Sequence, residues 1–410
     1  MEHHETLSPP QRAALLRSMN GGRAALGRRS LLRAAGLGAV ATAGLTACGI
    51  PAAGRKGDTA ASTDHSAQEK VVNFSNWDQY IDVSDDGKHR PSLEQFTKAT
   101  GIKVDYTEDI NDNVEFFGKI KPQLSAGQDT GRDLMVLTDW LAGRMIRLGW
   151  VQQLDAAHLP HAFANLEQRF RSPDWDPGRA YSYPWAGIPT CIAYNKKVTK
   201  GRKVTSVSQL LDDPALKGKA AMLSEMRDTV GMTLLDMGKK PETVTDDDYD
   251  AALSRIQGAV DKGQIRKFTG GEYTDGLSKG DIAACIAWAG DLVQLRLDDP
   301  NIEYAFPAAG YMTSTDNLLI PAKARHKTNA ERLIDWYYQP RIAAELAAYT
   351  TYVSPVMGVR EELAKIDQSL ADNPLIIPNA QMNATSHAFR SLSEDEDTRY
   401  EAKFSKLIGA

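Results

Sequence analysis

From Lys70 onward, short apolar runs alternate along the chain with segments whose apolar residues recur at the spacing of an α-helix. The predicted strands cover residues 71–74, 102–106 and 133–137, and the predicted helices cover residues 92–99, 111–126 and 140–148. Strands that alternate with helices form parallel sheets, because each helix carries the chain back to the start of the next strand. The sequence therefore predicts an α/β fold.

The length of 410 residues exceeds that of one ordinary domain and indicates two lobes. Hydrophobic residues make up 42% of the chain, which is enough for a sizeable core. Proline-containing turns at residues 183–184 and 306–307 flank a middle block, and we expect the chain to cross between the lobes there. The first lobe then comprises residues 70–182 with 308–410, and residues 183–307 form the second. Ligands of such folds bind in the crevice between the lobes.

The N-terminal region has the order of features found in an export signal. Residues 28–33 (Arg-Arg-Ser-Leu-Leu-Arg) form a twin-arginine pattern, and an uncharged run of small apolar residues follows from Ala34 to Ala47. This run is too short and too weakly apolar to remain in a bilayer as a permanent helix. It ends in Leu-Thr-Ala before Cys48, which resembles a bacterial lipobox, whose thiol is joined to a lipid. We therefore predict that residues 1–47 are a twin-arginine lipoprotein signal peptide and that Cys48 is lipidated.

Residues 48–69 are rich in Ala, Gly, Ser, Thr and Asp, which is the composition of a flexible tether between an anchor and a folded body. A signal peptide, a lipid anchor and a tether in this order predict an exported protein. We expect it on the outer face of the cell membrane or in the periplasm, held to the membrane by its lipid.

The net charge of −5 is unevenly distributed. Residues 1–47 contain six arginines and two glutamates, a net charge of +4, which leaves −9 for the remainder of the chain. An acidic body argues against nucleic acid as a partner and mildly favours a cationic ligand.

The chain has three cysteines, Cys48, Cys191 and Cys285, and they form no CxxC motif and no cysteine–histidine cluster with metal spacing. No zinc site and no cofactor is therefore predicted. Cys191 and Cys285 lie in apolar, strand-like runs, where buried and inert thiols are the ordinary expectation. A disulfide between these two thiols stays open, because the sequence cannot place their Cα atoms.

Several segments of the chain, taken in order, resemble the periplasmic spermidine/putrescine-binding proteins of ABC importers. The resemblance runs from about Val71 to the C-terminus, and it depends on the order and spacing of motifs that are individually weak. The segments that carry it are residues 74–81 (FSNWDQYI), 96–104 (FTKATGIKV), 133–138 (DLMVLT), 183–195, 286–291 (IAWAGD) and 316–321 (DNLLIP).

This resemblance implies a two-lobed periplasmic-binding-protein fold of type II, in which each lobe is a mixed sheet flanked by helices. It also implies a binding protein rather than an enzyme. Such a protein captures a polyamine outside the membrane, acts as a monomer and delivers the ligand to the permease of an ABC transporter.

A polyamine is a chain of ammonium groups joined by methylenes, so its site needs spaced carboxylates, aromatic faces and apolar walls. Trp77 and Tyr80 follow a predicted strand, where they can clamp one end of the ligand, although such a pair is also ordinary core. Glu225 and Asp228 follow the apolar run 220–223 and match family positions that hold a terminal ammonium. The alternative is that they are acids in the first turn of a helix.

The resemblance also places four further residues at the ligand. Trp288 ends a predicted strand, Asp316 matches a family carboxylate that meets an internal amine, and Thr138 and Trp140 fit a polar and an aromatic position. One departure is Ser314, which stands where the family usually has an aromatic residue, so one aromatic wall of the site is missing.

Two other classes of function remain open at the level of sequence. The same fold can bind another small solute, such as a sugar, another amine or iron. A lipid-anchored enzyme or sensor is the alternative from a different class. The sequence contains no G-x-S-x-G nucleophile motif, no P-loop and no dinucleotide-binding glycine pattern, which argues against the common enzyme classes.

Overall fold

The computed structural model describes residues 62–84 and 86–409. The predicted signal peptide (1–47), Cys48 and the predicted tether up to residue 61 lie outside the described residues. Within the described ranges, no helix has the length and apolar character needed to cross a membrane.

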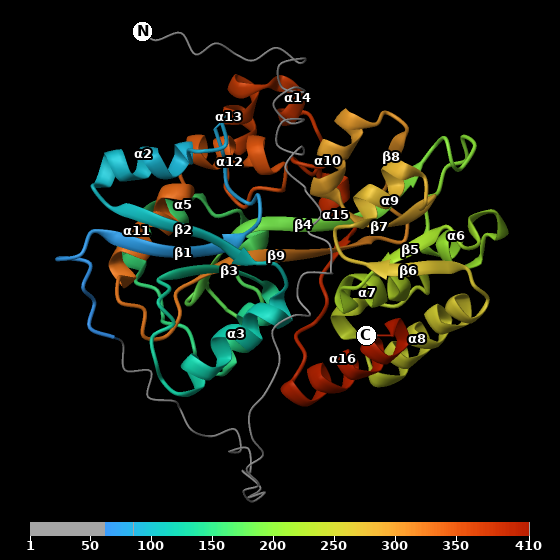
Figure 1. The fold of residues 1–410 in the computed structure, drawn as a ribbon, viewed down its shortest axis with the longest axis horizontal. Coiled ribbons are helices and arrows are strands. Elements are labelled where there is room, and N and C mark those ends of the chain that lie inside the picture. The colour runs from blue at the N-terminus through green and yellow to red at the C-terminus, as the bar shows by residue number, and fades with distance from the viewer. Residues whose placement is uncertain (1–61, 85, 410) are drawn as a thin grey trace, which may run out of the picture. The chain divides into compact units, whose positions relative to one another are not determined.

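Ten strands of the described chain form one connected sheet in the order β2-β1-β3-β9-β4-β7-β5-β6, with β8 paired to β4 and β10 to β9 (Figure 1). Neighbouring strands are parallel in the pairs β1–β2, β1–β3, β5–β6 and β5–β7. They are antiparallel in the pairs β3–β9, β9–β4 and β4–β7. The strands are β1 (Val71–Trp77), β2 (Lys103–Ile110), β3 (Leu134–Thr138), β4 (Ser182–Asn195), β5 (Ala220–Leu223), β6 (Ile265–Thr269), β7 (Ala284–Trp288), β8 (Ile302–Ala305), β9 (Tyr311–Leu319) and β10 (Ser386–His387).

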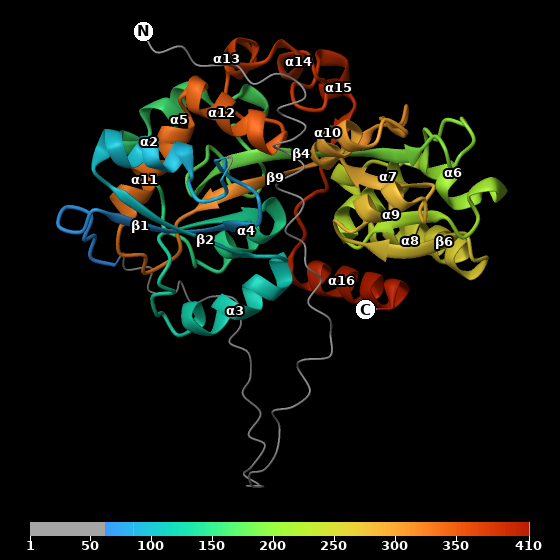
Figure 2. The same ribbon diagram turned by 45° about the horizontal axis from the view of Figure 1, so that its top comes forward.

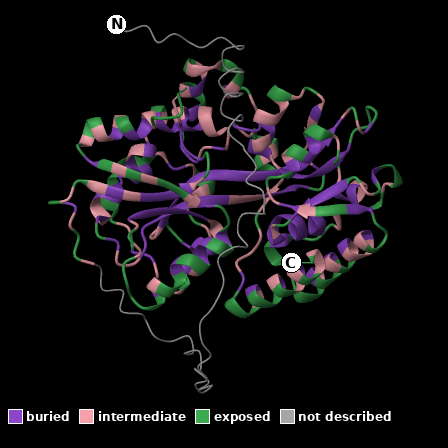
Figure 3. Ribbon diagram, viewed as in Figure 1, coloured by how far each residue is buried: buried purple, intermediate pink, exposed green. Residues whose placement is uncertain are grey.

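The long strand β4 joins the two halves of this sheet. Its residues 182–189 pair with β9, and its residues 190–195 pair with β7 and β8. All of its side chains are buried, so the hydrophobic core continues along it from one half to the other (Figure 3). Both ribbon views show β4 and β9 running between a group formed by β1, β2 and β3 and a group formed by β5, β6 and β7 (Figures 1 and 2). This mixed sheet with flanking helices confirms the predicted fold class.

Helices flank both groups of strands. Beside the first group lie α2 (Pro91–Thr100), α3 (Asn113–Ser125), α4 (Asp139–Arg147), α5 (Pro160–Asn165), α11 (Lys327–Tyr337) and α12 (Pro340–Thr350). Beside the second lie α6 (Val207–Asp212), α7 (Met226–Asp236), α8 (Asp246–Asp261), α9 (Tyr273–Lys279) and α10 (Ala289–Asp298). The remaining helices are α13 (Val359–Ile366), α14 (Gln368–Ala371), α15 (Ala380–Ala384) and α16 (Glu394–Ile408).

The periodicity of the sequence located the first six elements to within a few residues. For example, α2 begins with Pro91 in its first turn and ends at Gly101, whose φ of 72° is the left-handed conformation that glycine adopts without strain. Similarly, α3 begins after Asp112, whose side chain accepts hydrogen bonds from the amides of Val114 and Glu115.

The folded body begins before Lys70. The hydroxyl of Thr328 donates a hydrogen bond of 2.6 Å to the Asp64 carboxylate, and Glu69 lies 2.7 Å from a ring nitrogen of His326. These contacts fix residues 62–69 against the start of α11. This part of the predicted tether is therefore packed, because its polar side chains find partners on the body.

The last helix, α16, packs against the second group of elements. Tyr400 stacks on Tyr249 of α8 with 3.8 Å between ring centroids, and Phe404 meets Phe268 of β6 edge to face. The sequence had placed all of residues 308–410 with the first lobe. The contacts of Tyr400 and Phe404 are instead with α8 and β6, which belong to the block 183–307, and they depend on residues far away in the sequence.

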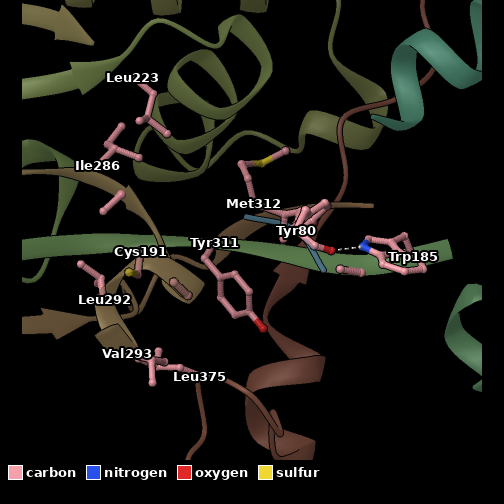
Figure 4. Close-up of a cluster of buried hydrophobic side chains, with 14 of the residues drawn as sticks. Tyr80, Trp185, Cys191, Leu223, Ile286, Leu292, Val293, Tyr311, Met312 and Leu375 are labelled. Atoms are coloured by element: carbon pink, nitrogen blue, oxygen red, sulfur yellow. Dashed lines mark hydrogen bonds between the residues drawn. The ribbon is translucent and has the colours of Figure 1, made fainter. Parts of the chain in front are cut away.

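Cys191 of β4 and Cys285 of β7 are both buried and both free. Burial raises the pKa of each thiol, as expected for inert core cysteines. Figure 4 shows Cys191 within a buried cluster that also contains Leu223, Ile286 and Leu292. The question of a disulfide is thereby answered: the two thiols serve as core side chains.

Candidate ligand-binding site

Asp316, Tyr80 and Thr138, which the sequence analysis selected separately, form one compact polar group. Asp316 of β9 stands opposite Thr138 of β3 in the antiparallel ladder. The hydroxyl of Tyr80 donates to one carboxylate oxygen of Asp316 at 2.8 Å, and the hydroxyl of Thr138 donates to the other at 2.8 Å. Burial raises the pKa of Asp316, while these two hydrogen bonds oppose that change. The carboxylate is therefore held by uncharged donors.

Asp228 and Trp288 form a second group. Asp228 lies in the first turn of α7, and Trp288 is the last residue of β7. The indole Nε1 of Trp288 donates to the Asp228 carboxylate at 2.8 Å. Burial raises the pKa of Asp228 to about 7, and the nearby charges of Asp139 and Asp316 act in the same direction. The two groups are thus close enough for their carboxylates to interact.

Glu225 has a different environment from the one predicted for a ligand contact. It caps the N-terminus of α7 by accepting a hydrogen bond from the amide of Arg227. Its carboxylate also lies 3.8 Å from the guanidinium of Arg227. Burial raises the pKa of Glu225 to about 8. The structure therefore shows the role in the first turn of a helix that the sequence left as an alternative, and a contact with ligand stays a prediction.

The two predicted tryptophans of the first lobe, Trp77 and Trp140, have different environments. The Trp77 indole donates to the carbonyl of Val136 at 3.0 Å, and its ring packs against the core. Trp140 instead lies under the guanidinium of Arg227, 4.7 Å from the ring centroid. An arginine of the protein itself thus occupies one face of Trp140.

A cavity of about 350 Å³ lies beside these groups. This volume falls within the range of roughly 300–1,000 Å³ that is common for small-molecule sites. Trp140 and Asp228 line the cavity, whereas the other predicted site residues do not. Among the further residues that line it are Asp139, Arg147, Arg227, Tyr311, Ser314 and Phe389.

Three residues that the sequence analysis did not select belong to this region. The ring of Tyr352 meets that of Tyr80 edge to face at 5.6 Å, and its hydroxyl donates to Asp291. Asp139 lies in the chain between two residues that were selected. Arg227 lies between Glu225 and Asp228, and its partners on α16 are distant in sequence. Asp139 and Arg227 are visible in the sequence only as neighbours of residues that were selected, whereas Tyr352 follows a helix and carries no sequence signal.

The sequence pattern of the family described as bacterial extracellular solute-binding protein matches residues 92–377, more than half of the chain. The chain belongs to this family. It is 26% identical over 346 residues to the spermidine/putrescine-binding periplasmic protein of Salmonella typhimurium, covering 84% of this chain and 94% of that protein. It is also 26% identical over 339 residues to a putrescine-binding periplasmic protein of Escherichia coli, covering 78% of this chain and 86% of that protein.

Solved structures show the same fold. The structure described as a spermidine/putrescine ABC transporter from Listeria monocytogenes superimposes with a TM-score of 0.71 at 22% identity, covering 83% of this chain and 99% of that one. The predicted resemblance and the two-lobed fold are therefore confirmed. Since the family consists of solute-binding proteins of transport systems, this member is a binding protein and not an enzyme.

Proposed function

We propose that this protein captures a polyamine of the putrescine or spermidine type between its two lobes and delivers it to the permease of an ABC transporter. The observation that carries the proposal is the pair of buried carboxylates Asp316 and Asp228. The side-chain hydrogen bonds of Asp316 and Asp228 come from hydroxyl and indole groups. Buried carboxylates with uncharged partners are costly, and a ligand ammonium would stabilise their ionised forms.

The surroundings of these carboxylates suit the rest of a polyamine. Tyr80, Tyr352 and Trp288 present aromatic surface beside the acids, which favours ammonium and methylene groups. The names of the relatives from Salmonella and Escherichia coli, which cover most of this chain, support the same ligand class.

The location follows from the N-terminal sequence. We propose export through the twin-arginine signal, cleavage before Cys48 and attachment of lipid to its thiol, so that the protein acts as a monomer at the outer face of the membrane. A single acyl chain holds a protein only marginally, so diacyl or triacyl modification is expected. Mass spectrometry of membrane-extracted protein should find an N-terminus at Cys48 with acyl mass. An intact Met1 on mature protein would contradict the proposal.

We further propose lobe boundaries near residues 182–183 and 307–308, with α16 assigned to the second lobe on the basis of its contacts. The strand β4 begins at the first boundary and β9 begins shortly after the second, and the ligand would lie where these two strands pass between the lobes. Closure of the two lobes around the ligand would then complete the site.

Isothermal titration calorimetry with putrescine, spermidine and spermine tests the ligand class. Micromolar or tighter binding of at least one of them is expected. D-glucose should give no heat, because it carries no charge to match the carboxylates. If wild-type protein binds none of the three amines, the ligand class is wrong, although the solute-binding fold remains.

A second candidate is an amino acid with a terminal amine, such as 4-aminobutyrate. Arg147 lines the cavity, so a ligand carboxylate could find a partner there. The same titration should therefore include 4-aminobutyrate. Binding of 4-aminobutyrate in preference to the polyamines would favour this candidate.

A further inference from the structure

The segment of residues 385–393, which joins α15 to α16, crosses the molecule between the two groups of strands (Figures 1 and 2). We call this segment the strap. Two of its residues pair with β9 as the short strand β10, and Ala388, Phe389, Arg390 and Ser391 line the cavity. The strap therefore forms one wall of the space beside the carboxylates of the candidate site.

On one side the strap is bound to the second lobe. The amide of Arg390 donates to the carbonyl of Pro241 at 3.2 Å, and its Nε donates to the carbonyl of Val244 at 2.9 Å. Both carbonyls belong to the segment between α7 and α8. The helix α16, which continues the strap, packs on the same lobe through the stacking of Tyr400 on Tyr249. The strap should therefore move together with the second lobe.

On the other side an exposed carboxylate joins the strap to the first lobe. The hydroxyl of Ser391 donates to Oδ1 of Asp174 at 2.9 Å, and the amide of Ser391 donates to Oδ2 at 3.3 Å. A further contact, from Arg169 to the side-chain oxygen of Asn383, lies just before the strap. The bonds to Asp174 are open to water, which competes for the same groups. They should therefore break before the bonds of Arg390 do.

We propose that the strap is a latch across the cavity and that Asp174 is its catch. Asp174 is then a positioning residue, because it acts through Ser391 to keep the wall formed by Phe389 in place and so slows the release of ligand. Since the strap is bound to both lobes, the bonds between Ser391 and Asp174 must break before the lobes separate at this point. This inference goes beyond the proposed ligand class, and it rests on the proposed capture of a ligand between the lobes.

Hydrogen exchange in the ligand-free protein tests the catch. In Asp174→Ala the amide of Ser391 loses its acceptor, so peptides that cover residues 386–392 should exchange at least about 5-fold faster than in wild type. The matched control is Asp129→Ala, another exposed aspartate, which accepts from the amide of Gly131 in its own loop and does not line the cavity. Unchanged exchange of the strap in Asp174→Ala would overturn the proposal.

Stopped-flow measurements with spermidine test the effect on ligand release. In Asp174→Ala the dissociation rate constant should rise about 5-fold, and the association rate constant should change by less than about twofold. Ser391→Ala should accelerate release less, because the amide bond to Asp174 remains. The double variant should release spermidine no faster than Asp174→Ala alone, since both changes break the same pair.

Additive effects of the two substitutions, or an unchanged dissociation rate constant in Asp174→Ala, would overturn the latch. Failure of the wild-type protein to bind any polyamine would instead overturn the proposed ligand class. The exchange experiment needs no ligand, so it still decides whether Asp174 holds the strap. The two failures are therefore distinguishable.

Discussion

The carboxylate of Asp316 accepts hydrogen bonds from two uncharged hydroxyl groups, those of Tyr80 and Thr138. Such a site is preorganised, because the aspartate needs no rearrangement to receive a cation. The sequence analysis selected Tyr80, Thr138 and Asp316 because each lies in a segment that carries the family resemblance. It could not predict Asp139, whose importance comes from lining a cavity, a property that no spacing in the chain encodes.

Asp316→Asn removes the charge and preserves the size of the side chain, so the fold should survive. A ligand ammonium would lose a charge-assisted hydrogen bond worth about 1.5–3 kcal/mol, which corresponds to a roughly 10–150-fold loss in affinity for spermidine. Calorimetry on the variant, after its thermal unfolding has been compared with wild type, measures this loss. Affinity within twofold of wild type would show that Asp316 makes no such contact.

The raised pKa values of Asp139, about 6, and Asp228, about 7, predict a dependence on pH. Unfolded aspartate ionises near pH 4, so between about pH 4 and 7 the folded, ligand-free protein binds more protons than the unfolded chain. Its stability should therefore fall as pH rises through this window. A cationic ligand binds the ionised carboxylates, and its stabilising effect should grow over the same range.

Thermal unfolding at pH 5, 6, 7 and 8, with and without saturating spermidine, measures both trends. The increase in melting temperature caused by spermidine should be smallest at pH 5 and largest at pH 8. In the double variant Asp139→Asn/Asp228→Asn this pH dependence should flatten. A ligand effect that is largest at pH 5 would show that the carboxylates are not the ligand's partners.

At the level of elements, the start of α10 depends on a close approach to the segment after α12. A Cβ atom on Gly290 would lie 2.5 Å from the ring of Tyr352, whose hydroxyl donates to Asp291 in the same helix. The absence of a side chain at Gly290 therefore lets Tyr352 reach both Asp291 and the ring of Tyr80.

Gly290→Ala should displace Tyr352 and lower the free energy of unfolding by about 1–3 kcal/mol, as overpacking does elsewhere. Gly258→Ala in α8 is the matched control, because a Cβ atom there meets no atom within 4 Å. That control should be neutral or stabilising by up to about 1 kcal/mol, since alanine favours the helix. Chemical denaturation compares the two variants, and equal stabilities would contradict the packing argument.

The helix α16 is joined to α7 by the ion pairs of Arg227. The Asp397 side chain is 8% exposed, so the loss of its charge leaves the guanidinium with fewer partners in a poorly solvated place. Asp397→Asn should therefore destabilise the protein by about 1.5–3 kcal/mol. The exposed pair of Arg399 with Asp246 provides the comparison, and Asp246→Asn should cost less than about 1 kcal/mol. Similar losses in denaturant titrations would mean that burial adds nothing to the Arg227 pair.

At the scale of the whole molecule, the sequence predicted an α/β fold because hydrophobic periodicity is a local property of each segment, whereas the two lobes were predicted from the length of the chain. The placement of α16 was missed for the opposite reason. Tyr400 contacts Tyr249 and Arg227 contacts Asp397, and each pair is separated by about 150–170 positions in the chain. No local pattern in the sequence predicts these contacts. The same limit applies to the cavity, which exists only where several distant segments meet.

Binding of a ligand should bring the two lobes closer together. Two lobes connected by β4 and β9 should move together when ligand bridges their carboxylates. Small-angle scattering with saturating spermidine should give a smaller radius of gyration than scattering without it. An unchanged radius with a ligand whose binding calorimetry has confirmed would count against closure.

Because β9 lies between β3 and β4, these two strands cannot complete their pairing until a late stage of synthesis on the ribosome. By the time residue 305 has been added, β4 to β8 are complete, and so is the group of β1, β2 and β3. The edges of β3 and β4 that face each other in the finished sheet nevertheless remain unpaired until residues 311–319 emerge and fill the gap. Exposed strand edges invite pairing with other chains. The nascent chain is therefore most in need of protection by chaperones during the interval before β9 arrives.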